Sequence, residues 1–231
     1  MELLHEGDSY MEREQGLAEI RRTRIIAIVR GVEESDAERL AEALRLGGIT
    51  VMEITMNTPG AERMIRRLRE TFVGKMFIGA GTVTDSEELA KALEAGASFA
   101  VTPNTDEEVI RQAADAGIPI FPGAMTPSEI VRAWKAGATA VKLFPSASLG
   151  LGYIQELQGP LSHIPMIAVG GVRPDNIAEF LRAGCYAVGV GSSIVNLRQI
   201  KAGNWSWIEE QARKLVQEAL PYRESVAGNE K

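Results

Sequence analysis

The chain has 231 residues, of which 45% are hydrophobic and 24% charged, and its formal net charge is −6. This composition is ordinary for a soluble globular protein and excludes a disordered or collagen-like chain. The length suits one barrel domain spanning residues 1–231. The acidic surplus argues against a nucleic-acid partner, because phosphate backbones are bound through excess Lys and Arg.

Targeting and metal-binding signals are also missing from the sequence. No apolar run approaches the roughly 20 residues that a membrane-spanning helix needs, and the first residues are acidic where a signal peptide would be basic. We therefore expect a cytoplasmic protein with no membrane partner. Cys185 is the single cysteine, and the two histidines, His5 and His163, are too few to build a metal site. We expect no metal and no cofactor.

The first elements are a polar helix and a buried strand. Residues 8–22 are helix-compatible and lie outside the later repeat, so we predict an extra N-terminal helix there. Residues 25–30 form an apolar run that ends in a charged residue, as a buried strand does when its tip reaches solvent. The sequence from Ser35 to Glu38 is typical of a capping box that opens the next helix.

A strand–helix repeat fills the rest of the chain. Ala-Gly pairs recur after amphipathic segments and before short apolar runs, and one repeat unit takes 20 to 24 residues. A strand, a helix and two loops fit this period, and alternating strands and helices imply a parallel sheet. We predict eight strands, near residues 25–30, 51–56, 77–81, 98–102, 118–121, 139–144, 166–169 and 186–190.

Eight such units predict a single (β/α)8 TIM barrel of the α/β class. Short apolar strands that are buried on both faces favour this closed barrel over an open doubly wound sheet. No Gly-x-Gly-x-x-Gly follows the first strand, which further weakens the open-sheet alternative. A last helix near residues 207–220 completes the ring, and residues 223–231 are typical of a terminal tail.

Two ionisable residues interrupt the apolar strands. Lys142 lies in the sixth predicted strand and Glu53 in the second. They could form a buried ion pair, but such a pair is a poor source of stability because both charges must be desolvated. A catalytic pair is the alternative that we favour. Burial would lower the pKa of Lys142 and free its amine to attack a carbonyl, while Glu53 transfers protons.

Other unusual residues follow the strands at their carboxyl ends, where barrels place their active sites. Gly170 and Gly171 follow the seventh strand, and Gly191 and Ser192 follow the eighth. These loops commonly bind phosphate through backbone N–H groups, although a glycine pair alone also marks a turn. Arg30, at the end of the first strand, could hold a substrate carboxylate or pair with an acidic residue at the barrel mouth.

Five motifs resemble the class I aldolases that act on 2-keto-3-deoxy-6-phosphogluconate (KDPG) and 4-hydroxy-2-oxoglutarate (KHG). The match runs from about residue 20 to residue 220, and the order and spacing of the motifs make it specific. The motifs are VMEITM at 51–56, GAGTV at 79–83, VKLFP at 141–145, GGV at 170–172 and VGVGS at 188–192.

The resemblance implies roles for several residues in and near these motifs. Lys142 would form the Schiff base and Glu53 would shuttle protons, without a cofactor. The pyruvate pocket would be lined by Thr82, Pro103 and Phe144. The phosphate would be held by Gly170, Gly171 and Ser192, in the loops that also contain Gly191. The partners would be a small 2-keto acid, phosphorylated or not, and two further copies of the chain in a homotrimer.

Two positions depart from the family pattern. Asn57 stands where many members carry an arginine, so Arg30 would contact the substrate carboxylate instead. Val169 stands where a threonine is usual, so a pocket hydroxyl is missing. Together with residues 102–104, both changes resemble the branch that acts on the galactonate epimer, 2-keto-3-deoxy-6-phosphogalactonate (KDPGal).

Two other functions remain open at this point. The first is a sugar-phosphate isomerase or epimerase on the same barrel, in which Glu53 shifts protons and Lys142 polarises a carbonyl. The second is a non-catalytic sugar-phosphate-binding subunit, in which the two residues are a structural ion pair.

Overall fold

The structure, a computed structural model, describes residues 6–223, with side chains described from residue 13 onward. Its strands form one sheet in the order β5-β4-β3-β2-β1-β9-β8-β7-β6, and every pair of neighbours is parallel. The strands are β1 (Ile25–Val29), β2 (Val51–Thr55), β3 (Phe77–Gly81), β4 (Ala100–Val101), β5 (Ile120–Phe121), β6 (Gly123–Ala124), β7 (Val141–Leu143), β8 (Met166–Val169) and β9 (Ala187–Val190).

The sheet closes through the segment that contains β5 and β6. These two strands lie on either side of Pro122, β5 pairs with β4, and β6 pairs with β7. Proline has no N–H to donate, so it separates the two short strands. β5 falls within the strand predicted at 118–121, and β6 lies just beyond that predicted range. The Pro122 carbonyl still accepts a hydrogen bond from the Lys142 backbone N–H at 2.8 Å. All eight predicted strand regions are thus present, and the predicted (β/α)8 barrel is confirmed.

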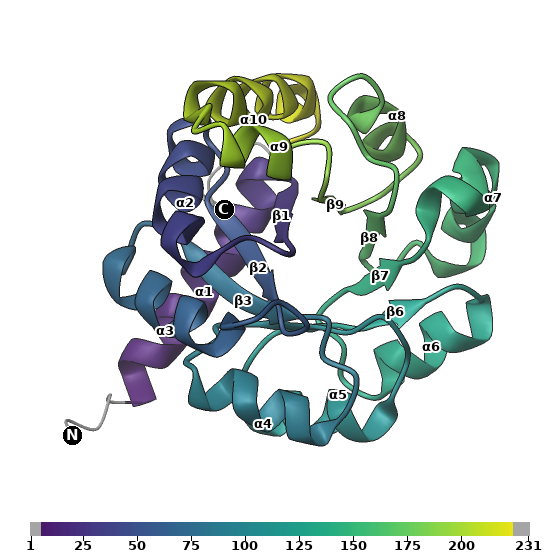
Figure 1. Ribbon diagram of the computed structural model, residues 1–231. Coiled ribbons are helices and arrows are strands. Elements are labelled where there is room, and N and C mark those ends of the chain that lie inside the picture. Colours follow the sequence, from purple (N-terminus) through teal and green to yellow (C-terminus); the bar gives the residue numbers. More distant parts are fainter. Residues whose placement is uncertain (1–5, 224–231) are drawn as a thin grey trace, which may run out of the picture.

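Helices surround the sheet in a ring (Figure 1). They are α1 (Glu6–Thr23), α2 (Ala37–Leu46), α3 (Ala61–Thr71), α4 (Ser86–Glu94), α5 (Glu107–Asp115), α6 (Pro127–Lys135), α7 (Ser146–Leu161, interrupted at Gly150), α8 (Ile177–Arg182), α9 (Leu197–Lys201) and α10 (Trp205–Ala219). No helix within residues 6–223 combines the length and apolar character that spanning a bilayer requires.

The Ala-Gly pairs that revealed the repeat end helices in the structure. After α4 and α5, the glycines Gly96 and Gly117 have φ of 85° and 74°, and Gly137 and Gly184 after α6 and α8 have 111° and 103°. Glycine adopts this left-handed conformation without the steric penalty of a side chain. The repeat therefore records the point at which the chain leaves each helix and turns toward the next strand.

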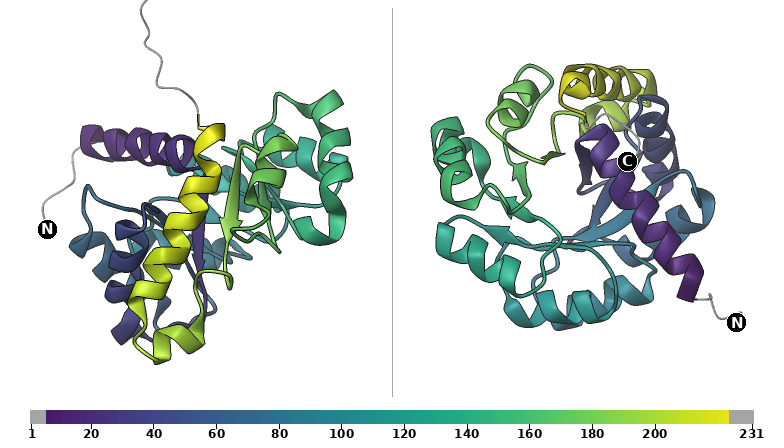
Figure 2. Two further views of the ribbon diagram at one scale, coloured as in Figure 1. Left: turned by 90° about the horizontal axis from the view of Figure 1, so that it is seen from above. Right: turned by 180° about the vertical axis from the view of Figure 1, so that it is seen from behind.

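The predicted N-terminal helix is α1, which runs across the end of the barrel where the strands begin (Figure 2, right). Its Ile20 is fully buried in the barrel interior together with Phe77 and Phe99. The rings of Phe77 and Phe99 lie 5.0 Å apart between centroids, and the ring of Phe121 lies 5.5 Å from that of Phe99. Apolar side chains thus fill the end of the barrel where the strands begin, which we call the lower end; the carboxyl ends of the strands form the upper end.

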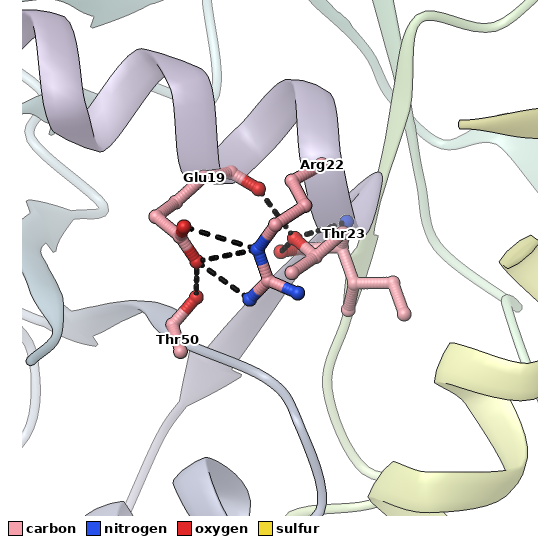
Figure 3. Close-up of polar contacts among 5 residues, drawn as sticks. Glu19, Arg22, Thr23 and Thr50 are labelled. Carbon is pink, nitrogen blue, oxygen red and sulfur yellow. Dashed lines mark hydrogen bonds and ion pairs between the residues drawn. The ribbon is translucent and has the colours of Figure 1, made fainter. Parts of the chain in front are cut away.

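Polar contacts fix α1 to the sheet at the same end (Figure 3). Glu19 accepts hydrogen bonds from Arg22, at 2.7 to 3.1 Å, and from the hydroxyl of Thr50 at 2.5 Å. Thr23 donates its hydroxyl to the Glu19 carbonyl at 2.9 Å. Glu19 and Arg22 therefore satisfy each other's charge at this end of the barrel.

One local prediction is wrong, and another lies mostly outside the described residues. The capping box from Ser35 to Glu38 is wrong, because Glu34–Asp36 form a 3₁₀ turn and Asp36 makes no side-chain capping bond to α2. Glu38 instead forms an ion pair with Arg67 of α3. The predicted tail, residues 223–231, lies outside the described residues except for Arg223.

Candidate active site

Lys142 and Glu53 reach the interior of the barrel from separate strands. Lys142 lies on β7 and Glu53 on β2, and their exposed fractions are 6% and 2%. Both side chains line one small cavity, whose wall is otherwise apolar and includes Phe121 and Val169. The structure therefore brings the two predicted catalytic residues together in a small, mostly apolar space.

Burial determines the ionisation of both groups. It raises the pKa of Glu53, while the nearby positive charges of Lys142 and Arg30 act in the opposite direction with smaller effect. It also lowers the pKa of Lys142, Glu53 partly opposes this shift, and Arg30 adds to it. The two groups influence each other through space and not through a hydrogen bond. Desolvation outweighs the attraction of the carboxylate, so the neutral amine of Lys142 is more easily formed than that of a lysine in water.

A glycine on the neighbouring strand makes room for the carboxylate. A Cβ atom at Gly81 would lie 2.4 Å from Oε1 of Glu53, so only glycine lets β3 pass this close to the carboxylate. Gly79 serves packing instead, because a Cβ there would lie 2.5 Å from the ring of Phe99. The glycines of this motif therefore accommodate side chains of the chain itself.

Arg30 and Thr82 meet at the barrel mouth. The Arg30 guanidinium donates a hydrogen bond from Nη2 to the Thr82 hydroxyl at 3.0 Å. Arg30 is exposed and, although its charge acts on Glu53 through space, it forms no direct ion pair among the described residues, which favours the substrate-carboxylate alternative over closure of the mouth by an ion pair. Its remaining N–H groups can bind a carboxylate.

Phe144 and Pro103 lie near the lysine. The ring centroid of Phe144 is 5.2 Å from Nζ of Lys142, and the ring remains 41% exposed. Pro103 lies against β6, because a Cβ at Gly123 would lie 2.3 Å from the Pro103 carbonyl carbon. Gly123 in turn pairs with Lys142 in the sheet. Both residues therefore stand where they could shape a pocket over the amine.

The glycine loops after β8 and β9 expose backbone amides. Gly170 and Gly171 have φ of 101° and 77°, a conformation that other residues rarely adopt. Within residues 6–223, the N–H groups of Gly170, Gly171 and Ser192 have no acceptor. Gly191, which precedes Ser192, accepts hydrogen bonds from Ile194 and Val195 at its carbonyl. Successive free amides of this kind can bind an anion such as phosphate.

One predicted site residue lies apart from the others. Asn57 is exposed and lines a surface hollow of the β2–α3 loop, with Pro59 and Arg63, rather than the cavity of Lys142. In the part of the chain that the structure describes, no group of three His, Cys, Asp or Glu residues could hold a metal ion.

Sequence reasoning missed the apolar wall of the cavity. Ile28, Phe121 and Ile167 contribute to it from β1, β5 and β8. The signal available was strand alternation, since Ile28 pairs with Glu53 in the sheet and neighbouring paired residues point to the same face. Sequence reasoning also missed the buried hydroxyls of Thr55 and Thr58, because threonine is common at strand ends and helix starts for purely structural reasons.

The sequence and fold are similar to those of known proteins. A family model for KDPG and KHG aldolase matches residues 17–211. The chain belongs to the KDPG and KHG aldolase family. Members of this family are aldolases, which are carbon–carbon lyases, and so is this chain.

Two relatives of this family are similar to the chain over most of its length. The chain is 36% identical over 203 residues to 2-dehydro-3-deoxy-6-phosphogalactonate aldolase of Escherichia coli (strain K12), covering 87% of this chain and 96% of that protein. It is 34% identical over 204 residues to 2-dehydro-3-deoxy-phosphogluconate aldolase of Pseudomonas aeruginosa, covering 88% and 92%.

A solved structure of the aldolase family has the same fold. The KDPG aldolase of Legionella pneumophila, with pyruvate captured at low pH as a covalent carbinolamine intermediate, is similar with a TM-score of 0.80 and 33% identity. The match covers 87% of this chain and 97% of that one. In that protein pyruvate is therefore bound covalently.

Proposed function

We propose that the protein is a class I aldolase that cleaves KDPG reversibly to pyruvate and glyceraldehyde 3-phosphate, and KHG to pyruvate and glyoxylate. One observation carries this proposal: burial lowers the pKa of Lys142 inside a cavity that Glu53 shares. A neutral amine beside a group that can give and take protons is the arrangement that Schiff-base chemistry requires. Family membership supports the same activity.

In the proposed reaction, the Lys142 amine attacks the C2 carbonyl of the 2-keto acid and forms a carbinolamine. Loss of water gives an iminium, which withdraws electrons from C3. Glu53, directly or through water, removes the C4 hydroxyl proton, and the C3–C4 bond breaks to release the aldehyde. The remaining enamine takes a proton at C3, and water then releases pyruvate and restores the amine.

The remaining site residues bind the two ends of the substrate. Arg30 would hold the carboxylate, with Thr82, Pro103 and Phe144 around the pyruvate unit. The amides of Gly170, Gly171 and Ser192 would hold the phosphate, with Gly191 supporting this loop. Binding the phosphate away from the reacting carbons provides energy that positions C3 and C4.

A second substrate is supported by one position in the cavity. Val169 lines the cavity with a hydrocarbon side chain where a hydroxyl is usual in the family, and the similar Escherichia coli protein bears the phosphogalactonate name. We therefore propose KDPGal as the alternative substrate. Comparing kcat/KM for the two phosphorylated epimers decides between them, and the better substrate is the one with the higher value.

Pyruvate and borohydride test the activity itself. Reduction in the presence of pyruvate should add one pyruvate-derived group to each chain, and peptide mapping should locate it at Lys142. The isomerase and the non-catalytic binding protein would give no adduct, so an unmodified protein between about pH 6 and 9 rejects the aldolase, because a perturbed lysine titrates in this range. We also propose that the protein is a homotrimer, so light scattering should give the mass of three chains. We further propose that it resides in the cytoplasm.

A further inference from the structure

Two buried threonine hydroxyls connect the loop after β1 to the loop after β2. Thr55 ends β2 and is fully buried, and Thr58 follows it with an exposed fraction of 3%. Their Oγ1 atoms lie 2.8 Å apart and share a hydrogen bond. The Thr58 hydroxyl also accepts a hydrogen bond from the backbone N–H of Gly31 at 3.0 Å. This pair of hydroxyls therefore joins two loops that are distant in sequence.

The loop held by Thr58 contains the residue before Gly31, which is Arg30. Gly31 has a φ of 68°, so the chain turns sharply directly after Arg30. Arg30 is exposed, and its guanidinium donates a hydrogen bond to Thr82. The backbone at residues 30 and 31 sets the point from which the Arg30 side chain reaches the barrel mouth. The Gly31 amide, held by Thr58, thus fixes the backbone directly after Arg30.

Thr58 is itself firmly placed. Its N–H donates to the Thr55 carbonyl at 2.8 Å, and its own carbonyl accepts from the N–H of Ala61 at 3.1 Å. Thr55 lies two residues after Glu53 on β2, so the two side chains leave the same face of the strand. The hydroxyl contact therefore relates the Arg30 loop directly to the strand that carries the proton-transfer group.

We propose that Thr58 is a positioning residue that holds the Arg30 loop in the geometry needed to bind the carboxylate of a 2-keto acid. This inference rests on the proposed function, in which Arg30 binds the substrate carboxylate. Loss of the hydroxyl leaves the Gly31 N–H without its buried acceptor and allows the loop to move. The amine of Lys142 is unchanged, so chemistry after binding is preserved.

The test measures the pyruvate concentration that gives half-maximal borohydride trapping. Thr58→Val removes the hydroxyl and keeps the shape of the side chain. It should raise this concentration on the order of fivefold, as expected for one lost hydrogen bond, while the maximal extent of trapping stays unchanged. Thr58→Ser retains the hydroxyl and should restore the wild-type value. Thr58→Ala is the second variant if the valine protein does not fold.

Thr23→Val is the matched control at the other end of the barrel. Thr23 is also fully buried, donates to the Glu19 carbonyl and accepts from the N–H of Ile25 at 3.4 Å (Figure 3). Its replacement removes an equivalent hydroxyl far from Arg30. Thr23→Val should lower the melting temperature and leave half-maximal trapping where it is in the wild type. A general loss of stability is thereby separated from a loss of positioning.

A double-mutant cycle with Arg30→Ala decides the mechanism. If Thr58 acts through Arg30, Thr58→Val should have no further effect on half-maximal trapping once Arg30 is gone. The same fold-change in both backgrounds, or an unchanged value in Thr58→Val alone, overturns the inference and leaves the proposed function standing. A wild-type protein that forms no pyruvate adduct overturns both.

Discussion

Glu53 and Glu19 lie toward opposite ends of one barrel, and their pKa values shift in opposite directions. For Glu53, burial dominates and raises the pKa. For Glu19, burial also acts to raise the pKa, but hydrogen bonds from Arg22 and Thr50 outweigh it and the pKa falls. At the lower end, hydrogen bonds stabilise the charged forms of Glu19 and Arg22, whereas in the upper cavity burial disfavours the charged forms of Glu53 and Lys142. In the proposed function, this difference distinguishes the reactive pair from the structural pair.

Replacement of a lysine in the upper cavity and of one at the lower end should give the largest difference in cleavage activity. Lys142→Met should reduce cleavage by about 10⁴-fold or more, because it removes the nucleophile, and it should abolish the pyruvate adduct. Lys75→Met is the control, since Lys75 borders the hollow beside α1 at the lower end and should leave both readouts unchanged. Cleavage kinetics and intact-protein mass measure the two effects. Full turnover by Lys142→Met would show that another amine reacts.

Gly81→Ala should have the next largest effect. The new Cβ would lie 2.4 Å from Oε1 of Glu53, so the carboxylate must move. A displacement of about 1 Å in a catalytic group can reduce the rate on the order of 10²-fold. Gly152→Ala in α7 is the matched control, because a Cβ there meets nothing within 4 Å. Equal kcat values for the Gly81 and Gly152 variants would argue that Glu53 tolerates displacement.

Removal of the charged pair should change the free energy of unfolding in opposite directions in the upper cavity and at the lower end. Glu53→Met with Lys142→Met should increase the free energy of unfolding by about 1–4 kcal/mol, because two poorly solvated charges are replaced by apolar groups. Glu19→Met with Arg22→Met should decrease it by less than about 1 kcal/mol, because that pair is partly exposed. Urea denaturation at pH 7 measures both. A loss of stability in the first variant would mean that the upper pair is structural.

The pH dependence of this gain follows from the two pKa shifts. The raised pKa of Glu53 contributes stability that is present below 4.5 and is lost as pH rises through the folded-state pKa. The lowered pKa of Lys142 contributes stability that is present above 10.5 and is lost as pH falls through the folded-state pKa. Between pH 4.5 and 10.5 the folded protein loses stability from both groups. The gain in stability of the Glu53→Met, Lys142→Met double variant should therefore be largest near neutral pH and shrink toward either extreme.

The smallest expected effects are shifts in the pH midpoint of adduct formation at saturating pyruvate. Glu53→Gln removes a negative charge that raises the pKa of Lys142, so the midpoint should move to lower pH. Arg30→Gln removes a positive charge that lowers this pKa, so the midpoint should move to higher pH by a smaller amount. Glu19→Gln should leave it in place. Shifts of the same sign in both upper variants would contradict the electrostatic account.

The barrel could be predicted from sequence because its signals are local. The glycines at 96, 117, 137 and 184 mark helix ends through their left-handed backbone, which no other residue adopts so easily. Pro122 is equally visible, but the pairing of residues 123–124 with β7 depends on which strand lies beside them, so the short strand β6 was not predicted. The predicted capping box did not form, and Glu38 makes an ion pair with Arg67 on another helix.

The candidate site was predictable where a charge interrupts an apolar strand, as at Glu53 and Lys142. The roles of Gly81 and Thr58 were not, because each depends on a contact between segments that only the closed barrel brings together. Gly81 accommodates a side chain of β2, and Thr58 binds the loop after β1. Periodicity identifies which face a residue occupies, but it does not identify the neighbour across that face.

The filled lower end of the barrel also bears on the order in which ligands come and go. With Ile20, Phe77 and Phe99 buried beneath the cavity, traffic to Lys142 passes through the carboxyl ends of the strands. In the proposed reaction pyruvate is bonded to the lysine, deepest in the site, and the aldehyde lies outside it. The aldehyde must then depart first during cleavage, and pyruvate must arrive first during synthesis. A barrel that is filled with apolar side chains at one end thereby gives the reaction a compulsory sequence.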